Sequence, residues 1–163
     1  MKTLQVLKRK IVTTEMLCSI ISRWEFKSEK VVFTNGCFDL LHQGHVDYLS
    51  KAADLGTKLV VGVNTDFSVR RLGKDKNRPL QDQDSRALII AALNFVDLVI
   101  LFDEDTPFQL IEQVKPHVLV KGSDYKIEQI VGHDLVTKRG GSVTTIEFLK
   151  GFSTSNIVAK ARK

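Results

Sequence analysis

The chain of 163 residues has little of what defines several large protein classes. Its two cysteines, Cys18 and Cys37, stand far apart and form no C-x-x-C pair, so the sequence indicates no disulfide framework. The longest apolar runs, such as residues 87–96, are too short to span a bilayer. The start, residues 1–12, has neither a long apolar region nor a small-residue cleavage site. We therefore expect no secretory signal and a reduced, cytoplasmic protein.

Linkers, repeats and low-complexity tracts are also missing, and there are only three prolines. The length is that of about one domain and is sufficient to bury a hydrophobic core. We expect a single domain over 1–163, in which a helix at about 13–26 precedes the core. That helix is indicated by Val12, Met16, Ile20 and Trp24, which recur every fourth residue.

Acidic residues are too few to balance the 24 basic ones, and the pI of 9.2 raises the possibility of nucleic-acid binding. Seven bases, however, lie in the first ten and last four positions, which contain no acid. The remainder of the chain has 17 bases against 19 acids. No aromatic-plus-basic interleaving supports a nucleic-acid surface. We expect neither a nucleic-acid nor a membrane partner.

Apolar runs alternate with amphipathic segments along the rest of the chain. We expect strands at 30–35, 58–64, 96–102, 117–122 and 142–148. We expect helices at 45–56, 85–95, 106–114, 126–139 and 153–163, a helical turn at 65–71 and a polar loop at 73–81. Because the strands are apolar on both faces, this pattern predicts an α/β fold, a doubly wound parallel sheet with helices on both faces.

The common phosphate-binding fingerprints are absent. No G-x-G-x-x-G follows the first strand, and no G-x-x-x-x-G-K-[ST] occurs anywhere. The first strand leads instead into "GCFDLLHQGH", residues 36–45, which sets His42 and His45 around Gly44 where a helix begins. A helix N-terminus favours anions, imidazoles donate hydrogen bonds to phosphate oxygens, and a glycine lets a ligand approach the backbone. The stretch predicts a phosphate cradle built from histidine.

Other interpretations of these residues stay open at this point. The two histidines can bind a metal with Asp39 as third ligand, although no cysteine cluster accompanies them. Asp39 can instead cap the turn. Further polar segments at 64–81, 121–125 and 150–156 also follow predicted strands. Ligands of doubly wound sheets bind beyond the carboxyl ends of the strands, so we expect one crevice to collect all of these segments.

The motif GxFDxxHxGH resembles the signature of the cytidylyltransferase-like nucleotidyltransferases. The resemblance covers roughly residues 11–163 and includes "NTDFSVRRL", "NRPL", "FDEDTPFQLIEQVKPHVLVKGSDY" and "GFSTSNIV". These segments are most similar to the adenylyltransferase domain of ADP-heptose synthesis, which we expect here as a stand-alone chain. The resemblance implies a Rossmann-like nucleotidyltransferase fold of the HUP type.

The resemblance also implies a reaction. AMP is expected to pass from ATP to D-glycero-β-D-manno-heptose 1-phosphate, giving ADP-heptose and pyrophosphate for lipopolysaccharide core or surface glycan synthesis. Mg²⁺ is expected to accompany ATP without a dedicated protein cage. The alternative enzyme is a cytidylyltransferase acting on glycerol phosphate or another small alcohol phosphate. A nucleotide-binding module without catalysis is a further possibility, which has less need for both imidazoles. A homodimer is expected.

The resemblance and the residue chemistry together give the expected site. The catalytic candidates are His42, His45 and Arg78. The nucleotide- and phosphate-binding candidates are Asn35, Gly36, Cys37, Phe38, Gly44, Lys121, Gly122, Asp124, Gly151, Ser153 and Thr154. The sugar-phosphate candidates are Asp39, Asn64, Asp66, Lys74 and Lys76. The sequence departs from the family pattern at Lys150, Phe152, Ser155 and Ser123.

Overall fold

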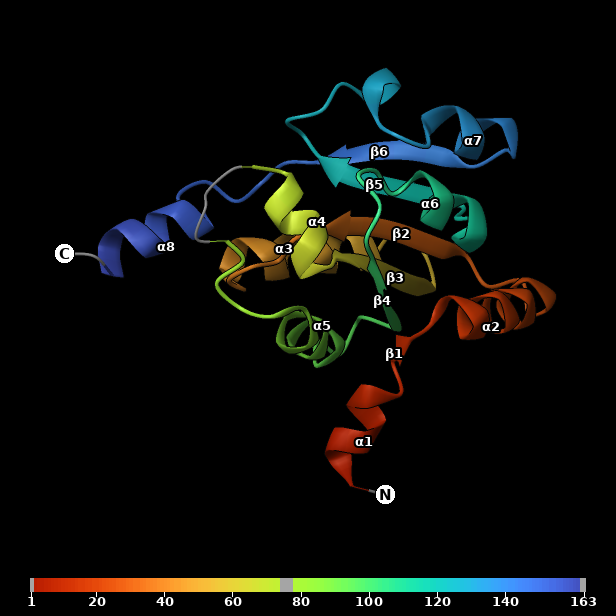
Figure 1. Cartoon of the computed structure of the whole chain (residues 1–163). Coiled ribbons are helices and arrows are strands. Elements are labelled where there is room, and N and C mark those ends of the chain that lie inside the picture. The colour runs from red at the N-terminus through yellow and green to blue at the C-terminus, as the bar shows by residue number, and fades with distance from the viewer. Residues whose placement is uncertain (1, 74–77, 162–163) are drawn as a thin grey trace.

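The computed structural model describes residues 2–73 and 78–161 (Figure 1). In that part of the chain, a single sheet contains six strands in the order β1-β4-β3-β2-β5-β6. The strands are β1 (Ile11–Val12), β2 (Val31–Gly36), β3 (Lys58–Asn64), β4 (Leu98–Phe102), β5 (Val118–Gly122) and β6 (Ser142–Ile146). Every adjacent pair is parallel. The expected doubly wound parallel sheet is confirmed.

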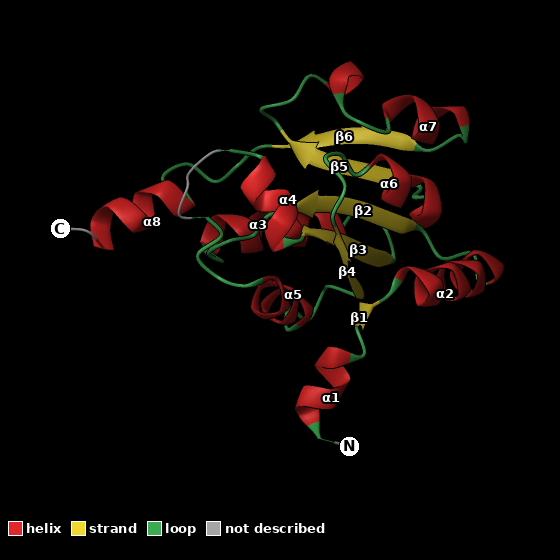
Figure 2. Cartoon of the chain, in the orientation of Figure 1, coloured by secondary structure: helices red, strands yellow, loops and turns green. Residues whose placement is uncertain are grey.

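Helices cover both faces of this sheet (Figure 2). They are α1 (Thr3–Lys8), α2 (Thr14–Phe26), α3 (Gln43–Ala53), α4 (Asp66–Arg71), α5 (Gln83–Ala91), α6 (Phe108–Val114), α7 (His133–Lys138) and α8 (Thr154–Ala161), with a 3₁₀ turn, η1, at Ile127–Gln129. Among the described helices, none is long and apolar enough to cross a membrane.

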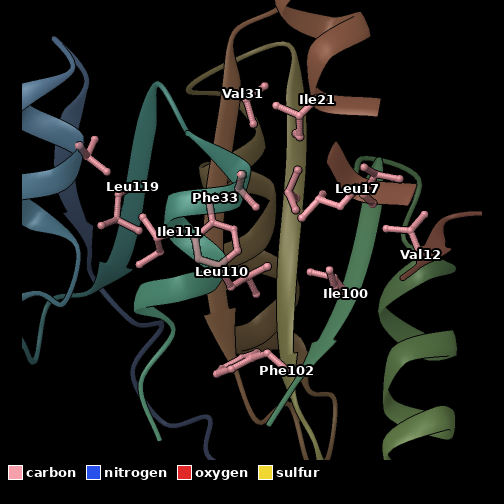
Figure 3. Close-up of a cluster of buried hydrophobic side chains, with 14 of the residues drawn as sticks. Val12, Leu17, Ile21, Val31, Phe33, Ile100, Phe102, Leu110, Ile111 and Leu119 are labelled. Atoms are coloured by element: carbon pink, nitrogen blue, oxygen red, sulfur yellow. The ribbon is translucent and has the colours of Figure 1, made fainter. Parts of the chain in front are cut away.

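Two hydrophobic layers hold the sheet between the helices. One layer packs α2, α6 and α7 against the sheet through side chains such as Leu17, Ile111 and Val136 (Figure 3). The other packs α3 and α5 through Leu49 and Ile90. Each large apolar side chain that is fully buried contributes about 1.5–3 kcal/mol. Because both faces of β2 and β3 are buried, these strands are fixed where the site is built.

Side chains cap the N-termini of two helices. The side chain of Asp82 accepts the N–H of Ser85 and so starts α5. Thr65 caps α4 in the same way, by accepting the N–H of Ser68. Thr13 is the N-cap residue of α2, but its side chain makes no capping bond. The boundaries of α4 and α5 are therefore set by local side-chain chemistry.

Several expectations about secondary structure were wrong. The helix expected at 126–139 is two pieces, because Gly132 has a φ of +90° and interrupts it before α7. Neither α1 nor the short edge strand β1 was expected. In α2, Met16 is half exposed, and the fully buried residues are Leu17 and Ile21. Ile20 and Trp24 are partly buried and pack against the same core, so Met16 is the residue of the predicted pattern that departs from it.

Candidate active site

A two-lobed cleft opens where β2 and β5 end, at the point where the strand order reverses. Ligands of doubly wound sheets bind at such a switch point. The first lobe has a volume of about 280 Å³ and includes residues of α3. The second has a volume of about 360 Å³ and includes Pro107 at the start of α6. The two lobes share a wall made by Asn35, Gly36, Cys37, Lys121 and Tyr125.

The histidine pair stands at the start of α3, beside the first lobe. His42 is the N-cap residue of the helix, but its side chain makes no capping hydrogen bond. The two imidazole rings are stacked, with centroids 3.8 Å apart and 15° between their planes. His45 lines the first lobe, and His42 lies behind it. A Cβ on Gly44 would lie 3.2 Å from the His42 ring, so the absence of a side chain at Gly44 leaves room for that ring.

Both imidazoles favour the neutral form. Burial, and secondly the proximity of His42, lowers the pKa of His45 to about 4. Burial also lowers the pKa of His42. The Nδ1 atom of each ring is buried without a hydrogen-bond partner. A buried polar atom without a partner is unfavourable, so a ligand that supplies one is stabilised here.

Asp39 links the histidine turn, residues 36–45 between β2 and α3, to the segment that carries Arg78. The Asp39 side chain is buried, and its Oδ1 accepts the backbone N–H groups of Leu80 at 2.7 Å and Gln81 at 3.2 Å. Its Oδ2 lies 3.9 Å from the Nε of Arg78. Both Asp39 and Arg78 line the first lobe. The carboxylate thereby brings a guanidinium to the lobe that contains His45.

Lys121 stands on the wall between the two lobes, at the end of β5. Its Nζ donates a hydrogen bond to Asn35 Oδ1 at 2.5 Å and lies 5.9 Å from the centre of the Tyr125 ring. Burial lowers the pKa of Lys121 to about 8, and the nearby Asp124 and Cys37 oppose that shift. A desolvated ammonium at this place attracts anions from either lobe.

An aromatic wall closes the other side of the first lobe. A Cβ on Gly122 would lie 2.1 Å from the Phe148 ring, so no other residue fits beneath that ring. The Phe148 ring in turn lies 5.6 Å from the ring of Tyr48, which belongs to α3. Asp124 lines the same lobe. The lobe combines apolar faces with a carboxylate, and small-molecule sites in general are mostly apolar with a few placed polar groups.

The start of α8 contributes less than expected. Thr154 lines the first lobe. The Oγ of Ser153 accepts the N–H of Asn156 at 3.1 Å, which is a capping bond within the helix. Gly151 has a φ of +87° in the turn before it. Of the expected hydroxyl pair, only Thr154 therefore faces the cleft.

The sequence model of the family described as cytidylyltransferase-like matches residues 33–160, which include every residue that lines the two lobes. The chain belongs to the cytidylyltransferase-like family. The resemblance seen in the sequence is thereby confirmed. The two histidines of the motif GxFDxxHxGH, on which that resemblance was based, are the stacked pair at the start of α3.

The comparisons with individual proteins agree with this family. "Bifunctional protein HldE" of Citrifermentans bemidjiense is 56% identical over 151 residues, covering 93% of this chain and 31% of that protein. HldE of Azorhizobium caulinodans is 50% identical over 152 residues, covering 93% of this chain and 32% of that protein. The chain thus spans about a third of the length of these curated relatives.

Solved structures share the architecture. A lipopolysaccharide core biosynthesis protein from Thermoplasma volcanium has a TM-score of 0.61 and 32% identity, covering 76% of this chain and 99% of that chain. Pantothenate synthetase from Thermus thermophilus has a TM-score of 0.61 at 19% identity, covering 91% of this chain and 67% of that chain. The second likeness concerns the fold alone.

The cleft of this family member collects most of the residues expected from the sequence. The first lobe is lined by the expected residues Asn35, Gly36, Cys37, Phe38, Asp39, His45, Arg78, Lys121, Gly122, Asp124 and Thr154. Asn64 lines the second lobe. Five expected residues line neither lobe, namely His42, Gly44, Asp66, Gly151 and Ser153. Lys74 and Lys76 lie outside the described residues.

Sequence reasoning missed several residues of this site. Tyr48 and Phe148 line the first lobe and were not expected there, and Tyr125 was expected only as part of the segment 121–125. The spacing of Tyr48, one turn after His45 on the same helix, was a usable signal. Arg86 was also missed, although it is the one basic residue of α5. Its hydrogen bonds place it directly behind the histidine turn.

The described residues contain no group of three or more His, Cys, Asp or Glu side chains that could hold a metal ion. The nearest acids to the histidine pair are otherwise engaged or face the lobe individually. Asp39 accepts two backbone N–H groups. The zinc interpretation of the pair therefore has no support in the geometry of the described residues, and a neutral imidazole can instead donate a hydrogen bond.

Proposed function

We propose that the chain is an adenylyltransferase that transfers AMP from ATP to D-glycero-β-D-manno-heptose 1-phosphate. The products are ADP-heptose and pyrophosphate, and ADP-heptose serves lipopolysaccharide core or surface glycan synthesis. The observation that carries the reaction type is the two-lobed cleft, in which His45, stacked on His42, lines one lobe and Lys121 lines both. The substrates are supported by the 50–56% identity to HldE proteins and by the lipopolysaccharide core biosynthesis protein.

The two lobes suit two substrates that meet at one wall. We place ATP in the first lobe, with its phosphates near His45, Arg78 and Thr154 and its nucleoside near Phe148. We place the sugar phosphate in the second lobe, near Asn64. An oxygen of the sugar phosphate then attacks the α-phosphorus at the wall that contains Lys121. The bond from that phosphorus to the bridging oxygen breaks, and its electron pair leaves with pyrophosphate.

Catalysis in this arrangement is positioning and electrostatic stabilisation. The phosphate nucleophile is already ionised, so no strong general base is needed. The barrier arises from repulsion between two anions and from charge that develops on the leaving pyrophosphate. The neutral imidazole of His45 donates a hydrogen bond to that charge, and the His42 ring stacked on it holds it in place. Arg78 and Lys121 neutralise the charge. These roles assign one function to each cationic or donor group in the cleft.

Mg²⁺ fits this cleft as a companion of ATP. Such an ion retains several waters and binds mainly through phosphate oxygens, needing only one or two carboxylates. Asp124 is a carboxylate that lines the first lobe and can serve as that ligand. When bound, Mg²⁺ offsets the charge of the triphosphate. The chain's own contribution is to hold Asp124 at the end of β5.

A turnover screen tests this function. The purified chain is supplied with ATP or CTP and with heptose 1-phosphate or glycerol phosphate, and pyrophosphate release is measured with mass detection of the nucleotide sugar. We expect ADP-heptose to form fastest. Equal or faster turnover with CTP, or preference for glycerol phosphate, would replace this proposal with the cytidylyltransferase alternative. Ligand binding without turnover would favour a non-catalytic module.

We also propose that the enzyme works in the cytoplasm as a two-fold symmetric homodimer, the commonest closed assembly. The edge strand β6 is only partly covered, and Phe26 at the end of α2 is exposed, so apolar and backbone groups remain for a partner. Each cleft is built from one chain. Light scattering after size exclusion decides the assembly, since a mass near 18.3 kDa contradicts the dimer.

A further inference from the structure

Arg86 is a charged side chain in the middle of the protein. It belongs to α5, its exposed fraction is 0%, and its neighbours on the helix, Ala87 and Ile90, are core residues. Burying a guanidinium is unfavourable by several kcal/mol unless each face of the group finds a partner. Three partners are present. Arg86 donates from Nη1 to the Cys37 carbonyl at 2.6 Å, from Nη2 to Asp66 Oδ1 at 2.7 Å and from Nε to the Gln81 carbonyl at 3.0 Å.

The bond to Cys37 acts on the histidine turn. The next residue, Phe38, has a φ of +48°, in the left-handed region that side chains with a Cβ rarely adopt. Such a backbone persists only where its surroundings fix it. Arg86 fixes the peptide that precedes Phe38. The Phe38 ring then meets the His45 ring edge-on, with centroids 5.3 Å apart and planes at 69°.

The bond to Gln81 acts on the segment that carries Arg78. Arg86 donates to the Gln81 carbonyl, while the N–H of Gln81 donates to Asp39. Asp39 also lies 3.9 Å from Arg78 and follows Phe38 in the chain. The turn and the Arg78 segment are therefore linked twice, through Asp39 on the side of the cleft and through Arg86 behind it.

We propose that Arg86 is a positioning residue, which fixes the histidine turn and the Arg78 segment relative to each other from behind the cleft. Arg86 lines neither lobe, so it acts through Cys37 and Gln81 and not on a substrate. The planar guanidinium reaches three acceptors in different directions, and a lysine ammonium cannot reproduce that fork. The effect on nucleotidyl transfer rests on the proposed function, whereas the effect of Arg86 on the backbone of the turn and of the Arg78 segment does not.

The activity test compares R86K with I90V, a buried substitution on the same helix that lies away from the turn. A misplacement of about 1 Å lowers a rate roughly 100-fold, so we expect kcat of R86K to fall about 10- to 100-fold per folded molecule, with each KM within about threefold. I90V is expected to lower the thermal midpoint at normal kcat. A normal kcat in folded R86K would overturn the proposal.

A double-mutant cycle separates positioning from two independent effects. If Arg86 acts by placing Arg78, its replacement does less harm once Arg78 is gone. The kcat loss in R78A/R86K is then smaller than the product of the two single losses. Losses that multiply fully would mean that Arg86 and Arg78 act separately, and would refute the coupling that is proposed.

A third measurement does not depend on activity. The backbone N–H groups of Leu80 and Gln81 donate hydrogen bonds to Asp39. Their amide hydrogens are expected to exchange with solvent faster in R86K than in I90V, when both variants are compared at equal global stability. Equal exchange would overturn the proposal even if the chain transferred no nucleotide. Conversely, selective exchange without turnover in the unmodified chain would count against the proposed function alone.

A second variant covers the case in which R86K does not fold. D66N leaves Arg86 in place but replaces its carboxylate partner, which is partly exposed on α4. We expect a kcat loss of about 3- to 10-fold, with the same selective exchange at Leu80 and Gln81. Unchanged kcat together with unchanged exchange in D66N would refute the positioning role.

Discussion

Two helix starts meet the same cleft, and they differ in how the protein holds them. The start of α3 lies beneath the histidine pair, and four residues of this helix, Gly44, Tyr48, Leu49 and Ala52, are buried. The start of α8 has no buried residue behind it, and this helix extends away from the body of the protein (Figure 1). Both were expected to bind phosphate, since free N–H groups and the helix dipole favour anions.

The two helix starts differ in how many contacts hold the groups that face the cleft. At α3, the turn is held by Asp39 and Arg86, and the two rings are fixed by stacking. At α8, one hydroxyl is used as a cap and only Thr154 faces the lobe. Preorganised donors stabilise developing charge without rearrangement during the reaction, whereas a mobile donor does not. We therefore expect α3 to affect kcat and α8 to affect binding.

The largest effect is expected at the α3 start. In H45A the first lobe loses a donor that faces the triphosphate, and removal of such a group costs about 2.7–4 kcal/mol, or roughly 100- to 1000-fold in kcat. The thermal midpoint is expected to move by only a few degrees, because the imidazole is partly exposed. Steady-state kinetics and a thermal melt measure the two quantities on one preparation.

H133A is the matched control, because His133 lies on α7, pairs with Asp134 and lines neither lobe of the cleft. Its kcat is expected to equal that of the unmodified chain. If H45A kept near-normal activity per folded molecule but lost much of its stability, the pair would be structural and the comparison of the two helix starts would fail.

The next effect is expected at Lys121, on the wall between the lobes. A charged hydrogen bond contributes about 1.5–3 kcal/mol, so K121M is expected to lose roughly 10- to 100-fold in kcat/KM. Burial lowers the pKa of this ammonium to about 8, so the charge disappears as the pH rises above that value. In the unmodified enzyme, kcat/KM should therefore fall above about pH 8, whereas K121R should keep its activity there.

K51M is the control for Lys121, since Lys51 forms an exposed ion pair with Asp47 on α3. No change in the pH profile is expected for K51M. If K121M showed the same alkaline fall as the unmodified enzyme, another group would be titrating. The assignment of Lys121 to both substrates would then be wrong.

How far the sequence could predict this molecule depends on how local each signal is. The strand at 58–64 was expected with the bounds that β3 has, because a continuous apolar run lies between polar ends. The two residues of β1 carry no periodicity and become a strand only by pairing with β4. The first lobe was expected because its segments follow strands. Arg86 was missed because its Cys37 partner is 49 positions away, which no local pattern reveals.

A smaller effect distinguishes the two helix starts without any substrate. The pKa of His45 in the folded chain is about 4, below its ordinary value of 6.5, so the unfolded chain takes up the proton first. The contribution to stability is complete above pH 6.5, falls as the pH drops toward 4, and is constant below. At about pH 5.5 the loss is about 1 kcal/mol. The free energy of unfolding, measured in urea, should fall less steeply with acid in H45Q.

The described part of α8 has no histidine, so substitutions at that helix start should leave this acid dependence unchanged. T154A, measured in parallel, provides the comparison. An unchanged slope in H45Q would mean that His45 is not held in its neutral form by burial, and the argument for a preorganised donor at α3 would lose its electrostatic basis.

The smallest effect is expected at α8 itself. T154A removes the hydroxyl that faces the first lobe, and T154S keeps it. One neutral hydrogen bond contributes about 0.5–1.5 kcal/mol, so KM for the nucleotide should rise about 3- to 10-fold in T154A, with kcat within about twofold. T154S should stay close to the unmodified chain.

S153A removes the capping bond to Asn156 and is the control, because it loosens α8 without removing a group from the lobe. A rise in KM for T154A but not for S153A assigns the effect to the hydroxyl. Equal rises in both variants would show that α8 acts through the order of its helix and not through the Thr154 hydroxyl. The start of α8 would then depend on a fixed backbone, as the start of α3 does.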